Sequence, residues 1–347
     1  MPYSTINSIE ISGMASSIPS HKILLKDMKG GSVRTIHKAS QFQTTADFGY
    51  AAAKYILSKK QIPLEEVGIL VFCTKTPDYR GPATAAVLQG RLSLSKDCIA
   101  FDVNVGSSGF IYGSQIVGSS LESTNSKYGL LIVGDTATKQ ITEDENLSIG
   151  FSDGASAILF EKRSITAPIY MKTMAFSDYY MSYMISKGGF RKSNELSDQE
   201  NSNFRSIENN YLKIDKKKLL NFAATEIPNA IANFLEHFDV DSKAYDFLAL
   251  HQFNHESNDM ISKKIDEKFK ELPSNYNSYG NTCGNSIPLL LTDCYGKITG
   301  KEKHILACAY GEGLSLGLMD MTINTDAIFD VILSNEYYEE GFISHKE

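Results

Sequence analysis

The chain has 347 residues, of which 42% are hydrophobic, so its length exceeds the usual single core and predicts two fused halves or two domains. A formal net charge of −7 argues against a general nucleic-acid binder. No stretch approaches the roughly 18 unbroken apolar residues of a membrane helix, and the polar N-terminus lacks the apolar core of a signal peptide. We therefore expect a cytoplasmic protein that binds neither nucleic acid nor a membrane.

The cysteine pattern argues against disulfides and zinc, because no C-x-x-C pair occurs and most of the cysteines fall in apolar runs. They are predicted to be reduced core residues. The glycine-rich segment Gly311–Gly313 is not surrounded by a P-loop or dinucleotide fingerprint. We therefore expect neither a metal nor a cofactor. The five cysteines are Cys73, Cys98, Cys283, Cys294 and Cys308.

Helical and strand patterns alternate from the N-terminus onwards, which favours an α/β architecture. Thr44 or Thr45 is predicted to begin a helix that runs through Leu57, and the apolar run Val67–Cys73 is predicted to be a strand. Gly81-Pro82 is predicted to open a second helix, through about Leu92, because proline suits the first turn of a helix.

The next strand, predicted over Cys98–Val105, runs into the small residues Gly106–Gly109, after which a helix is predicted from Phe110 to Ser120. Ser107 would lie at the helix start, where free N–H groups and the positive dipole end can stabilise an oxyanion. The small residues could instead only let the helix cross closely over a sheet. Two further predicted strands, Tyr128–Asp135 and Ala155–Phe160, close the first half.

The second half is expected to begin with a polar connecting excursion over residues 165–215, which shows little sustained periodicity. A similar order of helices and strands follows, and this order suggests an internal duplication. We therefore divide the chain into residues 1–164 and 165–347, the second with an acidic C-terminal tail. The elements predicted in the second half are helix Lys217–Phe238, strand Tyr245–His251, basic helix Asn254–Leu272, helix Ser286–Tyr295, and strands His304–Tyr310 and Leu314–Met321.

Several separated motifs then occur in one order and spacing: Phe101–Phe110, His251–Asn254, Gly280–Thr282 and Tyr310–Ser315. In these motifs the chain resembles the 3-oxoacyl-acyl-carrier-protein synthase III family of thiolase-fold condensing enzymes, from about residue 9 to residue 321. The resemblance implies a thiolase-like five-layered αβαβα fold of two similar halves, usually assembled as a homodimer. It also implies a nucleophile in the first half, and a histidine, an asparagine and a glycine-rich loop in the second.

The chain departs from this resemblance at the nucleophile, because the family carries a cysteine where this sequence has Ser107. A cysteine, with a pKa of about 8.5, is already partly thiolate at neutral pH, whereas a serine must lose its proton as it attacks and needs a general base. The resemblance implies His251 as that base and Asn281 as the residue that orients or donates beside it. Cys283 matches a small packing residue of the family rather than a substitute nucleophile.

A serine hydrolase of the α/β type is the competing interpretation of Ser107. Its nucleophile elbow requires the pattern G-x-S-x-G, and Val105 or Phe110 breaks that pattern in either register. The hydrolase interpretation is therefore rejected. By resemblance, the backbone N–H of Ser107 and one near Glu312 form the oxyanion hole that acyl transfer requires. Glu312 stands where the family carries small residues.

The acyl donor is expected to be an acyl-carrier-protein or CoA thioester. Lys263 and Lys264 match family positions that dock the acidic carrier protein. The stretch that helps the family hold the CoA nucleotide survives at most as Gly31–Arg34. The run that contains the two lysines is interrupted by acidic residues, and a charge run can also be only a solvated face.

The sequence therefore predicts a synthase III-like acyltransferase. Ser107 would take an acyl group from a carrier-protein or CoA thioester and pass it to a malonyl carbanion, a hydroxyl or an amine. Two alternatives stay open at this point. One is a catalytically silent thiolase-fold binding subunit that needs a partner chain. The other is an engineered variant of an ordinary synthase, in which a cysteine was replaced by Ser107.

Overall fold

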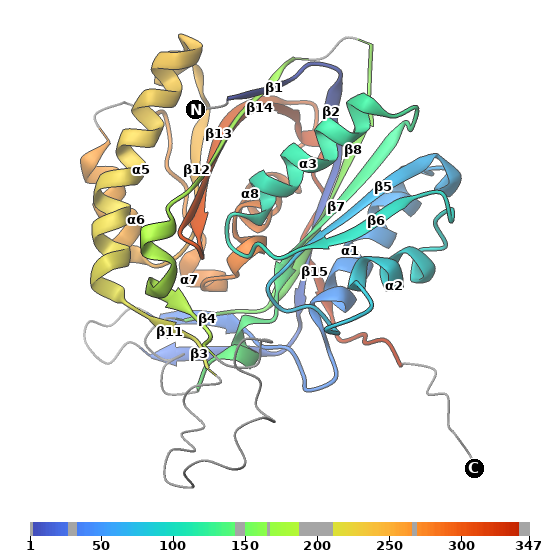
Figure 1. The fold of residues 1–347 in the computed structure, drawn as a ribbon, viewed down its shortest axis with the longest axis horizontal. Helices are drawn as coiled ribbons and strands as arrows, with labels where there is room; N and C mark the ends of the chain where they lie inside the picture. Colours follow the sequence, from blue (N-terminus) through green and yellow to red (C-terminus); the bar gives the residue numbers. More distant parts are fainter. Residues whose placement is uncertain are drawn as a thin grey trace, which may run out of the picture.

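The computed structural model describes residues 3–26, 33–142, 150–164, 167–186, 211–265 and 269–339, and two large sheets dominate it (Figure 1). The helices are α1 Thr45–Lys59, α2 Thr84–Arg91, α3 Gly109–Ser123, α5 Lys216–Phe238, α6 His255–Lys264, α7 Tyr276–Tyr279 and α8 Ser286–Tyr295. The strands are β1 Ser4–Ile6, β2 Ile9–Pro19, β3 Lys22–Lys26, β4 Val33–His37, β5 Val67–Cys73, β6 Ile99–Val103, β7 Tyr128–Asp135, β8 Gly154–Lys162, β9 Ile169–Ala175, β10 Tyr183–Met184, β11 Lys213–Ile214, β12 Phe247–Leu250, β13 Glu302–Gly311, β14 Ser315–Asn324 and β15 Ile332–Ser334.

Each large sheet draws most of its strands from one half of the chain and one strand from the other half. The six-stranded sheet has the order β15-β2-β8-β7-β5-β6, and the five-stranded sheet has the order β1-β9-β14-β13-β12. The N-terminal strand β1 pairs antiparallel with β9 in the second sheet, and β15, near the other end of the chain, pairs parallel with β2 in the first. Two small hairpin-like pairs, β3-β4 and β10-β11, lie outside these sheets.

Helices α3 and α8 lie between the two sheets (Figure 1). Their apolar side chains, among them Phe110 and Leu290, share one buried cluster with strand residues such as Val71 and Met319, which come from different sheets. Burying apolar side chains of two sheets and two helices together is the main stabilising term at the centre of the molecule.

The outer faces of the sheets are covered by other helices. A second apolar cluster joins α1 and α2 to the six-stranded sheet, and a third joins α5 and α6 to the five-stranded sheet. The order of layers is therefore helix, sheet, helix, sheet, helix. The five-layered αβαβα fold expected from the sequence is confirmed.

The start of α1 shows why these residues form a helix. Thr44 caps the helix, and the Asp47 carboxylate accepts a hydrogen bond from the Thr44 backbone N–H at 2.9 Å, as in a capping box. Phe48, Ala52 and Ile56 recur on one buried face. The predicted helix start at Thr44 or Thr45 is confirmed.

Helix α2 begins later than the Gly81-Pro82 signal predicts. Both oxygens of the Asp102 carboxylate accept backbone N–H groups at its first turn, from Thr84 and Ala85, each at 2.7 Å. An acidic side chain from strand β6 therefore satisfies the free N–H groups of the helix start. This cap is distant in sequence, and local composition does not reveal it.

Two predictions for the second half are corrected. The polar excursion over residues 165–215 contains β9, which lies inside the five-stranded sheet. Its Lys172 is buried and donates to the Tyr3 hydroxyl at 2.9 Å, so a lysine that looks exposed in sequence is paired inside. The basic helix predicted to run to Leu272 ends at Lys264 instead.

Two other features of the described residues bear on the expectations from composition. All five cysteines are free thiols in the structure, and Cys294 is the one that is partly exposed. None of the helices in the described ranges combines the length and the apolar character needed to cross a membrane.

Two histidines couple stability to pH in opposite directions. The hydrogen bond from His304 to Asp320, 2.7 Å long, raises the pKa of His304, so its contribution is complete below the unfolded pKa of about 6.5 and is lost as the pH rises through the folded value. Burial lowers the pKa of His251 to about 3. The unfolded chain therefore takes up this proton first, and stability falls as the pH drops from about 6.5 towards 3.

Lowering the pH from 6.5 to 5 should reduce the free energy of unfolding of the parent by about 1.5 kcal/mol more than that of His251→Gln. His304→Gln should show the opposite sign, with its deficit relative to the parent larger at pH 5.5 than at pH 8. Urea unfolding at each pH measures both. Parallel stability profiles for the parent and His251→Gln would contradict a neutral, buried His251.

Candidate active site

Ser107 lies where β6 of the first sheet passes into α3 between the sheets. The helix begins at Gly109 with Ser108 as its N-cap, so Ser107 precedes the helix start by two residues. The Gly109 N–H bonds to the Gly106 carbonyl at 2.7 Å and closes a tight turn around Ser107, whose side chain is buried. The Ser107 hydroxyl therefore lies at the end of β6 in the six-stranded sheet and just before the start of α3, where the sequence predicts it.

His251 and Asn281 approach from the second half. His251 follows β12, and its N–H is fixed to the Cys308 carbonyl at 2.9 Å. The loop at Gly150 holds Asn281, since the Asn281 N–H donates to the Gly150 carbonyl at 2.8 Å. These two side chains, far apart in sequence, are both completely buried.

The polar atoms of this pair are poorly satisfied. Within the described ranges, the two ring nitrogens of His251 have no hydrogen-bond partner, and the side-chain nitrogen of Asn281 has none either. The side-chain oxygen of Asn281, Oδ1, accepts the Cys283 N–H at 2.9 Å. Buried polar groups are normally paired, and unpaired ones mark places where a ligand can bind. The arrangement therefore leaves a potential base and a potential donor free for a substrate.

Glu312 supplies the most unusual contact of the site. It lies in the loop between β13 and β14, and its Oε2 accepts the backbone N–H of Ser107 at 3.0 Å. The Ser107 hydroxyl lies 3.5 Å from the other oxygen, Oε1. The N–H expected to stabilise a substrate oxyanion thus holds a carboxylate of the protein itself.

The ionised form of the Glu312 carboxyl group is strongly favoured. Burial alone would raise its pKa, but Lys75, the Glu312 backbone N–H and the Ser107 backbone N–H together lower the pKa to about 2. Both N–H groups expected in the oxyanion hole therefore stabilise the same carboxylate.

Gly311 allows the loop to come this close. A Cβ atom at Gly311 would lie 2.6 Å from the Cβ of Ser107, so a side chain there would push the loop away from Ser107. A Cβ atom at Gly106 would lie 2.8 Å from Glu312 Oε2, which is the end of a flexible side chain, so it would displace the carboxylate from the Ser107 N–H.

Lys75 completes the site, and sequence reasoning missed it. Two residues after β5, its Nζ lies 2.6 Å from Glu312 Oε1, 2.8 Å from the Tyr183 hydroxyl and 3.4 Å from Cys283 Sγ. Burial opposes its charge, but its neighbours Cys283 and Glu312 raise the pKa of Lys75 well above its ordinary value. A lysine two residues after a buried apolar strand, next to Thr76-Pro77-Asp78, was the signal that could have found it.

A cavity of about 280 Å³ opens beside this ion pair. Lys75 and Glu312 line it, together with Tyr183, Gly106 and Ser315 among others. The buried nucleophile, base and asparagine predicted from the sequence are not part of that lining. Glu312 therefore both lines the cavity and contacts Ser107.

Other residues named from the sequence lie outside this centre. Cys283 is fully buried, and burial raises the pKa of its thiol, which disfavours the thiolate that a nucleophile needs. Lys263 and Lys264 are exposed in the last turn of α6. The stretch Gly31–Arg34 is what the sequence predicts to remain of the family's CoA-binding segment. Its residues 31 and 32 lie outside the described ranges, and Arg34 donates a hydrogen bond to the Tyr276 hydroxyl.

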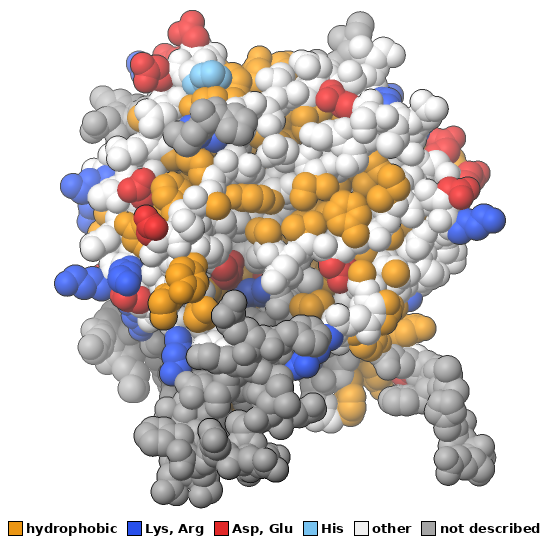
Figure 2. Space-filling view, viewed as in Figure 1, with side chains coloured by type: hydrophobic (Ala, Val, Ile, Leu, Met, Phe, Trp, Pro, Cys, Tyr) orange, Lys and Arg blue, Asp and Glu red, His pale blue; other side chains and the backbone are white. Residues whose placement is uncertain are grey.

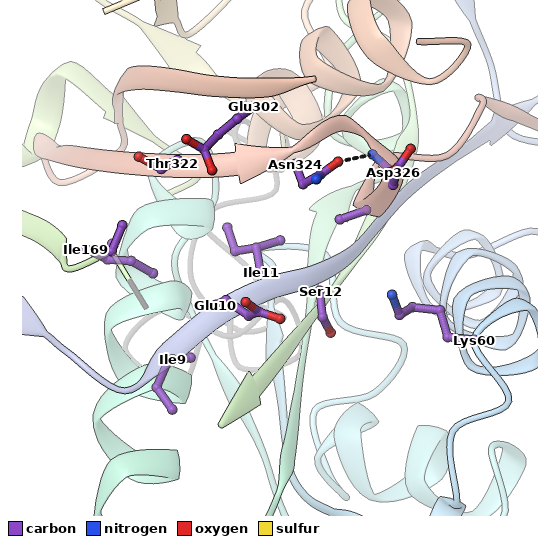
Figure 3. Close-up of a pocket in the computed structure, with 12 residues that line it drawn as sticks. Ile9, Glu10, Ile11, Ser12, Lys60, Ile169, Glu302, Thr322, Asn324 and Asp326 are labelled. Carbon is purple, nitrogen blue, oxygen red and sulfur yellow. Dashed lines mark hydrogen bonds between the residues drawn. The ribbon is translucent and has the colours of Figure 1, made fainter. Parts of the chain in front are cut away.

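A separate cavity of about 320 Å³ lies beside β2 and β14 (Figure 3). Its lining includes Glu10, Asp326 and Lys60. Two of its carboxylates already have partners: Glu10 pairs with Arg163 at 2.9 Å, and Asp326 accepts the Gly300 N–H at 2.9 Å. It contains none of the residues predicted to carry chemistry, so the site at Ser107 is the better candidate.

Two family descriptions and a set of curated relatives match the chain. The family description "3-Oxoacyl-[acyl-carrier-protein (ACP)] synthase III" matches residues 101–178, and its C-terminal counterpart matches residues 235–323. Beta-ketoacyl-[acyl-carrier-protein] synthase III of Streptococcus pneumoniae is 28% identical over 289 residues, which are 82% of this chain and 86% of the relative.

Solved structures share the fold over nearly their whole length. The 3-oxoacyl-(acyl-carrier protein) synthase of Burkholderia xenovorans superposes with a TM-score of 0.85 at 24% identity, covering 96% of this chain and 99% of that one. OleA of Xanthomonas campestris gives a TM-score of 0.73 at 18% identity, covering 92% and 98%. From the two family matches and the curated relatives, the chain is similar to the 3-oxoacyl-acyl-carrier-protein synthase III family, and the solved structures show that it shares the thiolase fold.

Proposed function

We propose that this protein is an acyltransferase that takes an acyl group from a carrier-protein or CoA thioester onto Ser107 and passes it to an acceptor. The observation that carries the proposal is the carboxylate at the Ser107 N–H, because this N–H already binds a negatively charged oxygen 3.0 Å away. An acyl transfer needs such a donor beside the nucleophile. The family names and the buried His251 and Asn281 support the same reaction class.

In the proposed first step, Ser107 Oγ bonds to the thioester carbon while its proton passes to His251. Burial lowers the pKa of His251, so its imidazole is neutral at physiological pH and has a lone pair for this proton, but the same burial makes it a weak base unless a nearby negative charge stabilises the imidazolium. The resulting oxyanion is held by the backbone N–H groups of Ser107 and Glu312 after the Glu312 carboxylate has moved aside. The carbon–sulfur bond then breaks, and the leaving thiolate takes the proton back from His251.

Asn281 is proposed to donate its free side-chain N–H to the substrate, beside the imidazole. The negative charge of Glu312 also raises the pKa of His251, and so favours the imidazolium that forms during the transfer. In the second step the acceptor attacks the acyl-serine ester and the bond to Ser107 Oγ breaks. With a hydroxyl or amine acceptor, His251 takes the acceptor's proton and returns it to Ser107 Oγ; with a malonyl acceptor, loss of CO₂ supplies the carbanion and Ser107 Oγ takes a proton from water. A malonyl carbanion, a hydroxyl and an amine remain the candidate acceptors.

A second candidate function is a silent binding subunit of the thiolase fold. One specific observation favours it: the Glu312 carboxylate occupies the predicted oxyanion hole and is anchored there by Lys75. If Glu312 never moves, no thioester carbonyl can reach the Ser107 N–H. The two candidates differ in whether Ser107 ever becomes acylated.

Incubation with acyl thioesters should add the acyl mass to the peptide that contains Ser107, and Ser107→Ala should abolish the addition. His251→Ala should slow acylation by roughly 10²–10⁴-fold, the usual loss for a general base. Asn281→Ala should also slow it. His255→Ala is the matched control, since His255 is exposed and bonds to Asn277 on the surface. Mass spectrometry over time measures the rates.

A different outcome would support the silent subunit. Ser107 is not a nucleophile if no acyl thioester changes the protein mass although a donor still binds, and if the affinity for that donor is the same in the His251 and Asn281 variants as in the parent. Retention of acylation in Ser107→Ala would also contradict the proposal, because the acyl group would then sit elsewhere.

We also propose that Lys263 and Lys264 dock an acidic carrier protein. Both are exposed at the end of α6, the helix that begins four residues after His251. A carrier bound at this helix would therefore deliver its thioester near the base. Electrostatic attraction of this kind mainly accelerates association and weakens with salt.

Charge reversal at both lysines should lower acylation by a carrier-linked donor about tenfold or more, and leave a small thioester with the same acyl group nearly unaffected. Lys297→Glu with Lys301→Glu is the control, because both side chains are exposed and the change in net charge is the same. Initial rates at two salt concentrations measure the effect. Equal losses with both donors would remove the docking proposal.

A homodimer is proposed through strand β6. This strand is the open edge of the six-stranded sheet, and its Ile99 is 49% exposed. Phe101 and Val103 on the same strand are only partly buried, and Figure 2 shows apolar side chains gathered across this face. An apolar, unpaired edge is a template for pairing with a second strand, here that of a second copy of the chain.

Ile99→Lys should shift the protein from dimer to monomer in light scattering at micromolar concentration, because it places a charge at the centre of the proposed contact. Leu24→Lys is the control, since Leu24 is 67% exposed on the β3-β4 hairpin and away from β6. A monomeric parent, or an unchanged dimer in Ile99→Lys, would contradict pairing through β6.

A further inference from the structure

The two oxygens of the Glu312 carboxylate have separate partners. Oε1 pairs with Lys75 Nζ at 2.6 Å, and Oε2 accepts the Ser107 N–H at 3.0 Å. The side chain of Glu312 thus satisfies a cation and the predicted oxyanion hole at once. An acyl group that reaches Ser107 displaces the Glu312 carboxylate. It must then bind both the Ser107 N–H and the Lys75 ammonium, or leave one of these two groups without a partner.

A Lys75 ammonium without a counter-ion would be strongly destabilised. Its side chain is only 11% exposed, and it lies in a pocket of aromatic and neutral groups: the Tyr183 and Phe151 rings are 4.8 and 5.6 Å from Nζ, and Cys283 is fully buried. An ammonium that loses its counter-ion in such surroundings loses most of its stabilisation.

The other nearby carboxylate is already engaged. Asp135 accepts hydrogen bonds from the Thr74 hydroxyl and from the backbone N–H groups of Lys75 and Gly284. These contacts fix the chain at the end of β5 and β7. Within the described ranges, Glu312 is therefore the carboxylate that directly pairs with the Lys75 ammonium.

We propose that Lys75 is the carboxylate-binding residue of the acyl site, and that the preferred acyl group is that of a short dicarboxylic acid such as malonyl. The inference rests on the proposed acyl transfer to Ser107. The thioester carbonyl takes the place of Oε2 at the Ser107 N–H, and the free carboxylate takes the place of Oε1 at Lys75. An acyl group without a carboxylate replaces only the first contact.

The structure provides room for this exchange. Glu312 is 21% exposed and lines the same 280 Å³ cavity as Lys75, so its side chain can turn into the cavity when a second carboxylate arrives. Tyr183 also lines the cavity and keeps Lys75 in place through its hydroxyl, 2.8 Å away. The exchange of one carboxylate for another leaves the charge beside Lys75 unchanged.

The binding site can be tested without acyl transfer. In Glu312→Ala the internal carboxylate is gone, so malonate should bind at Lys75 and Ser107, and isothermal titration calorimetry should detect it. We expect binding at least about tenfold tighter than that of acetate. The double variant Lys75→Met with Glu312→Ala removes both charges together and should lose this binding. Lys172→Met with Glu312→Ala is the control, because Lys172 is a buried lysine in β9, outside the site.

Acyl preference is tested in the unmodified protein with malonyl- and acetyl-N-acetylcysteamine. The malonyl mass should appear on Ser107 about tenfold faster or more, and the preference should vanish in Lys75→Met with Glu312→Ala. Equal rates for both donors in the unmodified protein would overturn the preference but leave acyl transfer standing. If neither donor labels Ser107, the proposed function fails, and the malonate titration alone decides whether the carboxylate site exists. Equal malonate affinity with and without Lys75 would overturn that site.

Discussion

The ion pair between Lys75 and Glu312 is the interaction on which the site depends. One partner follows β5 of the six-stranded sheet, and the other lies between β13 and β14 of the five-stranded sheet. Two largely buried charges are stable only when each has its partner and its hydrogen bonds. The pair therefore joins the two sheets beside Ser107, and both of its charges act on the pKa of His251.

The layers of the fold explain how residues of both halves come to flank the central helices. α3 and α8 fill the space between the sheets and share one apolar cluster with both of them. Ser107 arrives before α3, and Asn281 lies a few residues before α8. His251 follows β12, which is parallel to β13, and both strands lead to the same end of their sheet. The site is thus a consequence of how two sheets share one apolar layer.

Much of the fold followed from the sequence, because apolar runs bounded by polar residues are local signals. The strands Val67–Cys73 and Tyr128–Asp135 and the helix Ser286–Tyr295 have the predicted bounds. Strand β9 was missed because Lys172 looks polar until Tyr3 is found beside it. The roles of Ser107, His251 and Asn281 came from the order of motifs and remain predictions. The contact of Lys75 with Glu312 joins residues more than two hundred positions apart and has no local signature.

The exchange of end strands between the sheets has a consequence for how the molecule holds together. β1 belongs by position to the first half but completes the second sheet, and β15 completes the first sheet from the far end of the chain. A cut near residue 164 would therefore leave each fragment with an open sheet edge that only the other fragment can fill. The exchanged strands therefore interlock the two halves of the chain, because each large sheet is completed by a strand from the other half.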